Sequence, residues 1–358
     1  MAVTKESFGK TTKGVEAYKF TLTNSLGMKA VVTNFGAILV ELHVPDRDGK
    51  DADVVLGGEK VSDYEENGTY IGSTVGRNAN RIANAKFSIN GKEYSIYAND
   101  NENNLHSAPD VYNERFWDFE SGEDELGSFV TFRLHSADMD QGYPGNLDIS
   151  VTYIVSAAEN SLILHYNGIC DQDTIVNLTN HSYFNLAGHN SGLITDQKVW
   201  INADTFTEAT DKAIPTGKIL PVAGTPMDFT TEKAVGKDIA KEYTPLIYGG
   251  GYDHNYCLNP YDANADVHEV AKVASLYDEK SGRLMSVFTD LPGMQLYSGN
   301  FLKGAFTGKG GFVYESRFGI CFETQYFPNA INEPSFVSPV LKAGEEYDTT
   351  TIYSFSVR

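Results

Sequence analysis

The feature that most constrains the fold of this 358-residue chain is an alternation of apolar and polar residues with a period of two. It recurs from end to end, over residues 38–44, 130–134, 147–155, 162–166 and 351–357. In an extended chain every second side chain lies on the same face, so this period is typical of strands with one buried face. Polar turns separate the runs, which favours antiparallel pairing. The sequence therefore predicts an all-β fold, a sandwich or a barrel.

Local signals add detail to this prediction. Asn90-Gly91 lies between two short alternating runs and predicts a tight hairpin. Helical spacing is scarce, and one short helix is expected within residues 231–243, where Val235 and Ile239 stand four apart. Long loops are expected over residues 98–125 and 185–215. No repeat or linker divides the chain, so residues 1–358 are expected to form one domain.

Charge and cysteine content restrict the partners and the compartment. The formal net charge of −20 repels phosphate backbones and anionic lipid surfaces, so neither nucleic acid nor membrane is an expected partner. Cys170, Cys257 and Cys321 are too few, and odd in number, for a disulfide framework. The N-terminal residues contain no apolar signal region, and no run of 18 apolar residues occurs. A cytoplasmic location is the expectation.

Glu323 is the first candidate for a functional residue. It follows the apolar run Phe318 to Phe322, which is expected to lie in the core, and it precedes an aromatic and amide-rich segment. A carboxylate delivered by a buried strand has to be hydrogen-bonded, paired or functional, because burying an isolated charge is very costly. Aromatic faces and amides are also suited to a sugar pocket. Glu323 is therefore predicted to be a catalytic base.

Histidines and arginines in three other segments are further candidates. His181 lies among amides and aromatic residues, an environment that suits a tuned acid but also a core histidine satisfied by its neighbours. Arg77 and Arg81 flank a short polar segment; a solvated turn is an open interpretation for Arg77, whereas Arg81 is expected to point inward. His106 ends an amide-rich loop, where most histidines are simply exposed.

Metal, phosphate and nucleophile motifs are incomplete. Asp253, His254 and Cys257 cluster, but no second pair of cysteine or histidine ligands follows at zinc-site spacing. The glycines of residues 304–310 resemble a phosphate loop with the wrong spacing and with no Ser or Thr after Lys309. No serine occupies a nucleophile elbow. Neither a metal nor an organic cofactor is expected.

The chain resembles the galactose mutarotase, or aldose 1-epimerase, family. The likeness extends over nearly the whole chain and is carried by six segments in order: Gly76–Ile82, Asn103–His106, Asn180–Leu186, Gly250–Tyr256, Gln295–Leu302 and Glu323–Asn332. It implies a single-domain antiparallel β-supersandwich. It also implies an enzyme that interconverts the α and β anomers of free hexoses such as galactose or glucose.

The resemblance further implies roles for individual residues. Glu323 is the general base and His181 the general acid. Arg81, His106 and Asp253 bind the sugar hydroxyls, with Asn80 and Gln295 in the same pocket. The chain departs from the family pattern after His106, where Ser107-Ala108-Pro109 stands in place of Gly-Gly. If that loop borders the sugar, the preferred hydroxyl pattern differs from that of galactose.

Several points stay open at this level. His181 is expected to be charged in the resting enzyme, with Asp253 or another carboxylate raising its pKa. A non-catalytic carbohydrate-binding protein on the same scaffold is the main alternative function. A glycoside hydrolase would use two carboxylates, for which Asp253 and Glu323 are available. A mutarotase for phosphorylated hexoses would need an arginine cluster, and only Arg77 and Arg81 lie near the motifs. The preferred sugar and the oligomeric state cannot be inferred from these patterns.

Overall fold

The computed structural model describes residues 2–65, 68–263, 265 and 268–358. Strands make up 46% of the chain and helices 8%, which confirms the all-β prediction. The largest sheet is antiparallel and has nine strands in the order β11 (Asp118–Glu123), β12 (Gly127–Ser136), β13 (Leu147–Ser156), β14 (Ser161–Cys170), β27 (Glu346–Val357), β23 (Arg283–Thr289), β22 (Ala271–Tyr277), β17 (Lys198–Ile201) and β20 (Lys233–Ala234).

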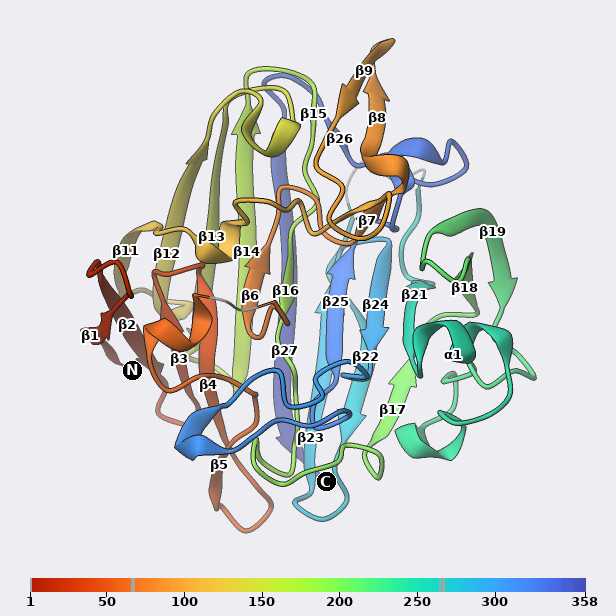
Figure 1. The fold of residues 1–358 in the computed structure, drawn as a ribbon. Helices are drawn as coiled ribbons and strands as arrows, with labels where there is room; N and C mark the ends of the chain where they lie inside the picture. Colours follow the sequence, from red (N-terminus) through yellow and green to blue (C-terminus); the bar gives the residue numbers. More distant parts are fainter. Residues whose placement is uncertain (1, 66–67, 264, 266–267) are drawn as a thin grey trace.

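Two five-stranded sheets accompany the large one (Figure 1). The first has the order β1 (Ala2–Lys10), β2 (Glu16–Thr23), β3 (Lys29–Thr33), β4 (Ile38–Pro45), β5 (Asp51–Asp53). The second has the order β19 (Pro215–Pro221), β18 (Thr205–Ala209), β21 (Asp253–Cys257), β24 (Gly293–Tyr297), β25 (Cys321–Gln325). Four two-stranded pairs complete the pattern: β6 (Ser73–Val75) with β16 (Thr179–His181), β7 (Arg81–Ile82) with β10 (Asn104–Leu105), β8 (Lys86–Ile89) with β9 (Lys92–Ser95), and β15 (Thr174–Ile175) with β26 (Val340–Leu341).

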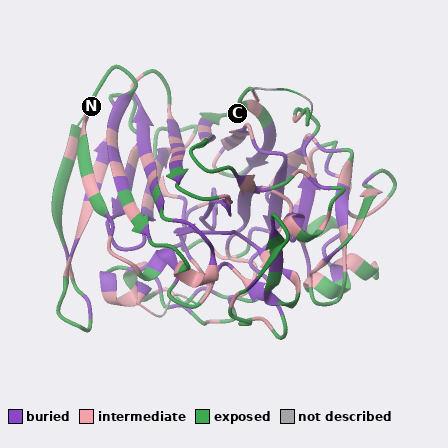
Figure 2. Ribbon diagram, turned by 90° about the horizontal axis from the view of Figure 1, so that it is seen from above, coloured by how far each residue is buried: buried purple, intermediate pink, exposed green. Residues whose placement is uncertain are grey.

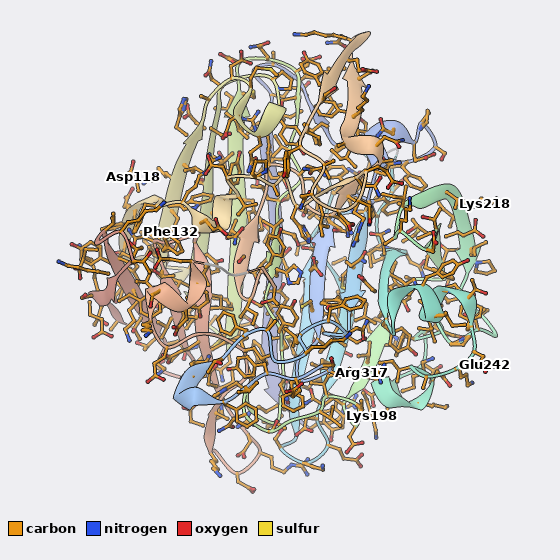
Figure 3. The ribbon with its side chains drawn as sticks, in the orientation of Figure 1. Asp118, Phe132, Lys198, Lys218, Glu242 and Arg317 are labelled. Carbon is orange, nitrogen blue, oxygen red and sulfur yellow. The ribbon has the colours of Figure 1, made fainter. Side chains whose placement is uncertain are left out.

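One apolar cluster joins the three large sheets. It contains Phe20 of β2, Phe132 of β12, Tyr353 of β27 and Phe322 of β25, all fully or almost fully buried. In Figure 2 the buried residues follow the inner strands, and exposed residues lie on the outer strands and loops. Figure 3 shows the Lys218 side chain at the margin of the molecule, where it is exposed, whereas Phe132 is fully buried. Burial of one face per strand is what the period of two predicts.

The predicted strands and hairpin are present. The alternating runs correspond to β4, β12, β13, β14 and β27, and Val155 pairs with Leu162 next to the turn between β13 and β14. Asn90 and Gly91 join β8 to β9 with backbone φ angles of 52° and 78°. Both residues lie in the left-handed region, as a two-residue turn between strands of right-handed twist requires.

The helix predicted within residues 231–243 is wrong. Lys233 and Ala234 pair with β17 instead, and Val235–Lys237 forms a single 3₁₀ turn. The one α-helix of the described residues, α1 (Thr244–Gly249), begins later, with Pro245 in its first turn, where proline is well tolerated. The other 3₁₀ turns are Val61–Tyr64, Ala83–Ala85, Tyr112–Glu114, Asp140–Gly142, Lys309–Gly311 and Ala330–Asn332. Within the described residues, no helix is long and apolar enough to cross a membrane.

The two predicted long loops are only partly loops. Residues 98–125 include β10 and β11, and residues 185–215 include β17, β18 and the first residue of β19. Strand β11 is rich in acidic and small residues, so it has little apolar alternation to reveal it. It is a strand because its backbone pairs with β12 over its whole length. Edge strands of this kind are specified by their neighbour rather than by their own pattern.

Arg77 is fully buried, so a solvated turn is the wrong interpretation for this residue. Its Nη1 donates to the carbonyl oxygens of Pro144 at 2.9 Å and Gly145 at 3.2 Å, and its Nη2 donates to the Ser136 carbonyl at 3.1 Å. Its Nε donates to the Tyr112 hydroxyl at 3.4 Å. The guanidinium therefore joins two segments through their backbone carbonyls and a third through the Tyr112 hydroxyl, and it has a structural position.

Replacing Arg77 with Met is expected to lower the free energy of unfolding by about 3 kcal/mol or more. Each buried carbonyl that loses its donor costs about 1–3 kcal/mol. Urea denaturation would measure the change. Arg133→Met is the matched control, because Arg133 is half exposed and pairs with Glu120 at the surface; it should change stability by less than about 1 kcal/mol. Equal effects of the two substitutions would contradict the structural role of Arg77.

Candidate active site

All seven site residues proposed from the sequence line one cavity of about 190 Å³. They come from segments distant in the chain: Asn80, Arg81, His106, His181, Asp253, Gln295 and Glu323. The remaining lining residues are mostly aromatic or small: Gly68, Thr69, Tyr70, Leu105, Tyr183, Tyr297 and Phe301. A concave site with apolar walls and a few convergent polar groups is the usual form of a small-molecule site.

Three adjacent strands deliver the acidic and amide side chains. Gln295 of β24 stands directly opposite Glu323 of β25, and Asp253 of β21 stands opposite Tyr297 of β24. Because side chains alternate along a strand, Gln295 and Tyr297 share one face, which is the cavity face. Gln295 Nε2 donates to Asp253 Oδ1 at 2.7 Å, so the amide and the carboxylate hold each other in place.

Short strand pairs supply the opposite wall. Arg81 of β7 pairs with Leu105 of β10, which places the next residue, His106, beside Asn80. The backbones of Asn80 and His106 are joined by a hydrogen bond from the His106 amide to the Asn80 carbonyl at 3.0 Å. Arg81 Nε donates to Asp100 Oδ2 at 2.7 Å, an ion pair that orients the guanidinium at the cavity wall.

His106 is buried rather than exposed, and one proton position is fixed by its neighbours. Its Nδ1 accepts a hydrogen bond from the Asn80 backbone N–H at 3.1 Å. Burial, together with the nearby His181 and Arg81, holds the pKa of His106 well below its usual range, so the ring is neutral. A neutral imidazole that accepts at Nδ1 carries its hydrogen on Nε2. His106 is therefore a hydrogen-bond donor through Nε2.

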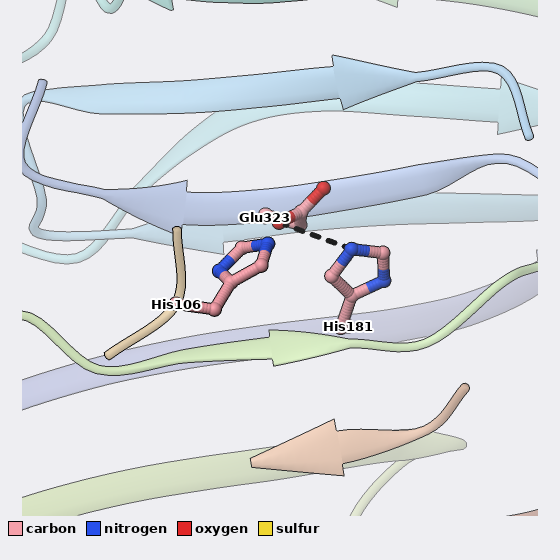
Figure 4. Close-up of side chains that lie close together, drawn as sticks. All are labelled: His106, His181 and Glu323. Atoms are coloured by element: carbon pink, nitrogen blue, oxygen red, sulfur yellow. Dashed lines mark ion pairs between the residues drawn. The ribbon is translucent and has the colours of Figure 1, made fainter. Parts of the chain in front are cut away.

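His181 and Glu323 form a buried pair at the centre of the cavity. The distance from His181 Nε2 to Glu323 Oε2 is 3.7 Å, and the two side chains are 7% and 2% exposed. Figure 4 shows both imidazoles directed toward the Glu323 carboxyl group. His181 belongs to β16, which pairs with β6, whereas Glu323 belongs to β25.

Burial dominates the proton affinities of this pair. It lowers the pKa of His181 to about 4. Burial, followed by the charge of Asp253, raises the pKa of Glu323 well above its usual range, and Arg81 opposes this shift. The expectation that a carboxylate raises the pKa of His181 and keeps it charged at rest is therefore wrong. Desolvation favours the neutral form of both groups.

Most of the aromatic residues that line the cavity were not among the site residues predicted from the sequence. The Tyr70 ring centroid lies 4.6 Å from that of His106 and 5.9 Å from that of His181. Tyr297 stacks on Phe301, which is 55% exposed. A usable signal existed for Tyr297, since it stands two positions after Gln295 on the same strand. For Tyr70 no pattern in the sequence points to the cavity.

Two residue groups have metal-ligand geometry among the described residues: His106 with His181 and Glu323, and Glu41 with His43 and Asp53. In the first group, the Nε2 hydrogen of His106 occupies the position through which that ring would bind a metal. In the second group, Asp53 is already paired with Lys309, and His43 with Glu41.

The Asp253, His254 and Cys257 cluster does not form a metal site. His254 accepts the Asp253 backbone N–H at Nδ1 at 3.0 Å, and its Nε2 donates to the Pro245 carbonyl at 3.1 Å. Both ring nitrogens are therefore used by the backbone. This ring has a structural role, which is to hold the backbone of Asp253 beside the cavity.

The loop that departs from the family pattern does not line the cavity. The Ser107 side chain is fully buried, and its Oγ donates to the Asn78 carbonyl at 3.0 Å or to the Tyr143 hydroxyl at 3.1 Å. Ala108 and Pro109 are also absent from the described lining residues. The expectation that this loop borders the cavity is therefore wrong.

Comparison with known proteins identifies similar chains over the full length. The family described as Aldose 1-epimerase matches residues 18–354. Human galactose mutarotase is 40% identical over 359 residues, which cover 99% of each chain. Galactose mutarotase from Sus scrofa is 38% identical over 357 residues, covering 100% of this chain and 99% of its own. The crystal structure of a C. elegans homologue of aldose epimerase superposes with a TM-score of 0.85 at 30% identity, covering 95% of this chain and 99% of that one.

Imidazole NMR of ¹⁵N-labelled protein at pH 7 is expected to show His106 as a neutral ring with hydrogen on Nε2 and none on Nδ1. The physical reason is the backbone N–H that Nδ1 accepts. A His106→Gln variant assigns the signal, and His135, which is exposed at the surface beside Asp148, provides a reference signal from outside the cavity. A His106 signal with hydrogen on Nδ1, or on both nitrogens at pH 6, would overturn the assignment.

Proposed function

Because this chain belongs to the aldose 1-epimerase family and is a mutarotase, we propose that its buried pair, Glu323 and His181, performs the proton transfers that open and close the sugar ring. The observation that carries the proposal is the 3.7 Å approach of their side chains in a cavity that is also lined by the other five proposed site residues. The substrate class is a monosaccharide. Interconversion of anomers requires only two proton transfers and one bond rotation.

Ring opening uses the carboxylate form of Glu323 and the imidazolium form of His181. Glu323 removes the proton of the anomeric hydroxyl, and the oxygen of that hydroxyl becomes the carbonyl oxygen. The bond between C1 and the ring oxygen breaks, and its electron pair stays on the ring oxygen. That oxygen takes the proton from His181 Nε2. The products are the open-chain aldehyde, a protonated Glu323 and a neutral His181.

Ring closure reverses the two roles. Rotation about C1–C2 presents the other face of the aldehyde to the hydroxyl at the former ring position. Neutral His181 removes the proton of that hydroxyl while its oxygen attacks C1. Glu323 returns its proton to the carbonyl oxygen, which becomes the new anomeric hydroxyl. The pair recovers its starting charges, and each well-placed proton transfer contributes a rate factor of about 10²–10⁴.

The pair carries one exchangeable proton throughout this cycle. A protonated Glu323 with a neutral His181 contains the same number of protons as the carboxylate and imidazolium pair. Burial favours the uncharged distribution, and attraction between the charges favours the charged one. A small difference in free energy between the charged and uncharged distributions would suit this reaction, because both distributions have to form once per turnover.

The other polar residues are proposed to bind and orient the sugar. His106 donates through Nε2 to a hydroxyl, and Arg81, oriented by Asp100, donates to another. Asp253 accepts from a hydroxyl while Gln295 holds its carboxylate. Fixed donors and acceptors limit the ring to a pose in which the anomeric centre faces Glu323.

Galactose is the proposed preferred substrate, because the similar human and pig proteins are galactose mutarotases. A phosphorylated hexose is disfavoured, since Arg77 is occupied by backbone carbonyls and Arg81 is the only arginine among the described lining residues. Hydrolysis by two carboxylates is also disfavoured, because an imidazole faces Glu323 and an amide engages Asp253. A protein that only binds sugar has no use for a buried acid and base with opposed pKa shifts.

Glu323→Gln and His181→Asn are each expected to lower kcat for galactose by at least about 10²-fold, the lower bound for one lost proton transfer. Polarimetry of freshly dissolved α-galactose measures the rate, after subtraction of spontaneous mutarotation. Both variants should keep the far-UV circular dichroism spectrum of the parent. Glu120→Gln, at an exposed ion pair, is the matched control and should be fully active. Near-parental rates for Glu323→Gln would disprove its role as the base.

The pH profile of kcat/KM is expected to be bell-shaped, with its acid limb well below pH 6.5. Activity requires one proton on the pair. Addition of a second proton is governed by His181, whose pKa burial lowers to about 4, and it removes the acceptor for the anomeric proton. Loss of the last proton, governed by the raised pKa of Glu323, gives the alkaline limb. His135→Asn should leave both limbs unchanged, and an acid limb near pH 6.5 would contradict the burial argument.

A further inference from the structure

The side chain of Cys321 contacts the nitrogen of His181 that faces away from Glu323. The distance from Cys321 Sγ to His181 Nδ1 is 3.6 Å, within the range of a hydrogen bond to sulfur. The cysteine is fully buried and His181 is 5% exposed, so water does not compete for this contact. Cys321 and Glu323 stand two positions apart on β25, so their side chains lie on the same face of the strand. One strand therefore contacts both nitrogens of a single imidazole.

The aromatic neighbours of His181 restrict the plane of its ring but do not determine which edge of the ring faces Glu323. The ring centroids of Tyr183 and Tyr297 lie 5.1 Å and 6.1 Å from that of His181. Such contacts hold an imidazole equally well after a 180° flip, which exchanges nitrogen and carbon positions around the ring. In the flipped ring a carbon would face Glu323 in place of Nε2. The contact between Sγ and Nδ1 distinguishes the two orientations, because only the unflipped ring presents a nitrogen to the thiol.

We propose that Cys321 is a positioning residue, which holds the His181 imidazole through Nδ1 and keeps Nε2 directed at the ring oxygen of the sugar in both protonation states. This inference rests on the proposed function of His181 as the acid. A thiol suits the task because it donates to an unprotonated Nδ1 and accepts from a protonated one.

A thiol forms only a weak hydrogen bond, and this weakness allows His181 to change its charge state. A carboxylate at Nδ1 would stabilise the imidazolium and oppose its return to the neutral form. Burial and the nearby charges of Glu323 and Asp253 raise the pKa of Cys321 well above its usual range, so the thiol stays uncharged. It therefore fixes the orientation of His181 without holding it in one charge state.

Polarimetry of three variants and the parent protein tests this inference. The variants are Cys321→Ala, Cys321→Ser and Cys170→Ala. Cys170 is a buried free cysteine on β14 and provides the control for loss of a thiol from the core. Cys321→Ala should lower kcat about tenfold, the factor that one net hydrogen bond supplies. KM should change less than about twofold, because the uniform binding of the sugar is unaffected. Cys321→Ser should recover most of kcat, since a hydroxyl also donates and accepts, and Cys170→Ala should match the parent.

Other outcomes would overturn the inference. An unchanged kcat in Cys321→Ala would show that the contact is dispensable. Equal losses in the alanine and serine variants, with a matching fall in Tm, would show that Cys321 only fills space. If the alanine variant does not fold, a tenfold loss in Cys321→Ser alone would be sufficient to reject the proposal. His181→Asn in the same series distinguishes failure of the Cys321 proposal from failure of the proposed function. If His181→Asn is active, the role of His181 as the acid is rejected.

Discussion

The burial of a carboxyl group beside an imidazole is the constraint on which the rest of this structure depends. Glu323 and His181 are almost completely removed from water, and removing ionisable groups from water is costly unless neighbours compensate. The fold tolerates the pair because burial lowers the pKa of His181 and raises that of Glu323, so both groups favour their neutral forms. Burial of the pair contributes little to the stability of the fold, so the packing of the surrounding sheets has to compensate for its cost.

The sheet register converts this constraint into a site. Glu323, Gln295 and Asp253 come from three neighbouring strands, and a slip of one residue in any of them would turn its side chain to the other face. Large apolar residues such as Phe322 and Leu296 occupy the opposite face of β25 and β24 and pack in the main core. The core thus specifies the register, and the register specifies which polar groups meet in the cavity.

The period of two was sufficient to predict the all-β class and the strands with a clear apolar face. The carboxylate at the end of an apolar run drew attention to Glu323, which lines the cavity. The remaining errors have one physical origin. Strand β11, the buried position of Arg77 and the contribution of Tyr70 are all specified by neighbours distant in the chain. A local pattern carries no information on such partners. The expected charge of His181 was wrong for the same reason, because desolvation depends on the completed fold.

Three buried histidines in this chain differ in what their Nδ1 atoms contact, and this difference separates their roles. His254 and His106 both accept a backbone N–H at Nδ1, which assigns their single hydrogen to Nε2. An N–H group cannot accept, so protonation of either ring at Nδ1 would break that bond and leave two donors facing each other. At His181 the partner is the thiol of Cys321, which can reverse its direction of donation. Of the three rings, His181 is therefore the one whose surroundings allow it to gain and lose a proton without losing its orientation.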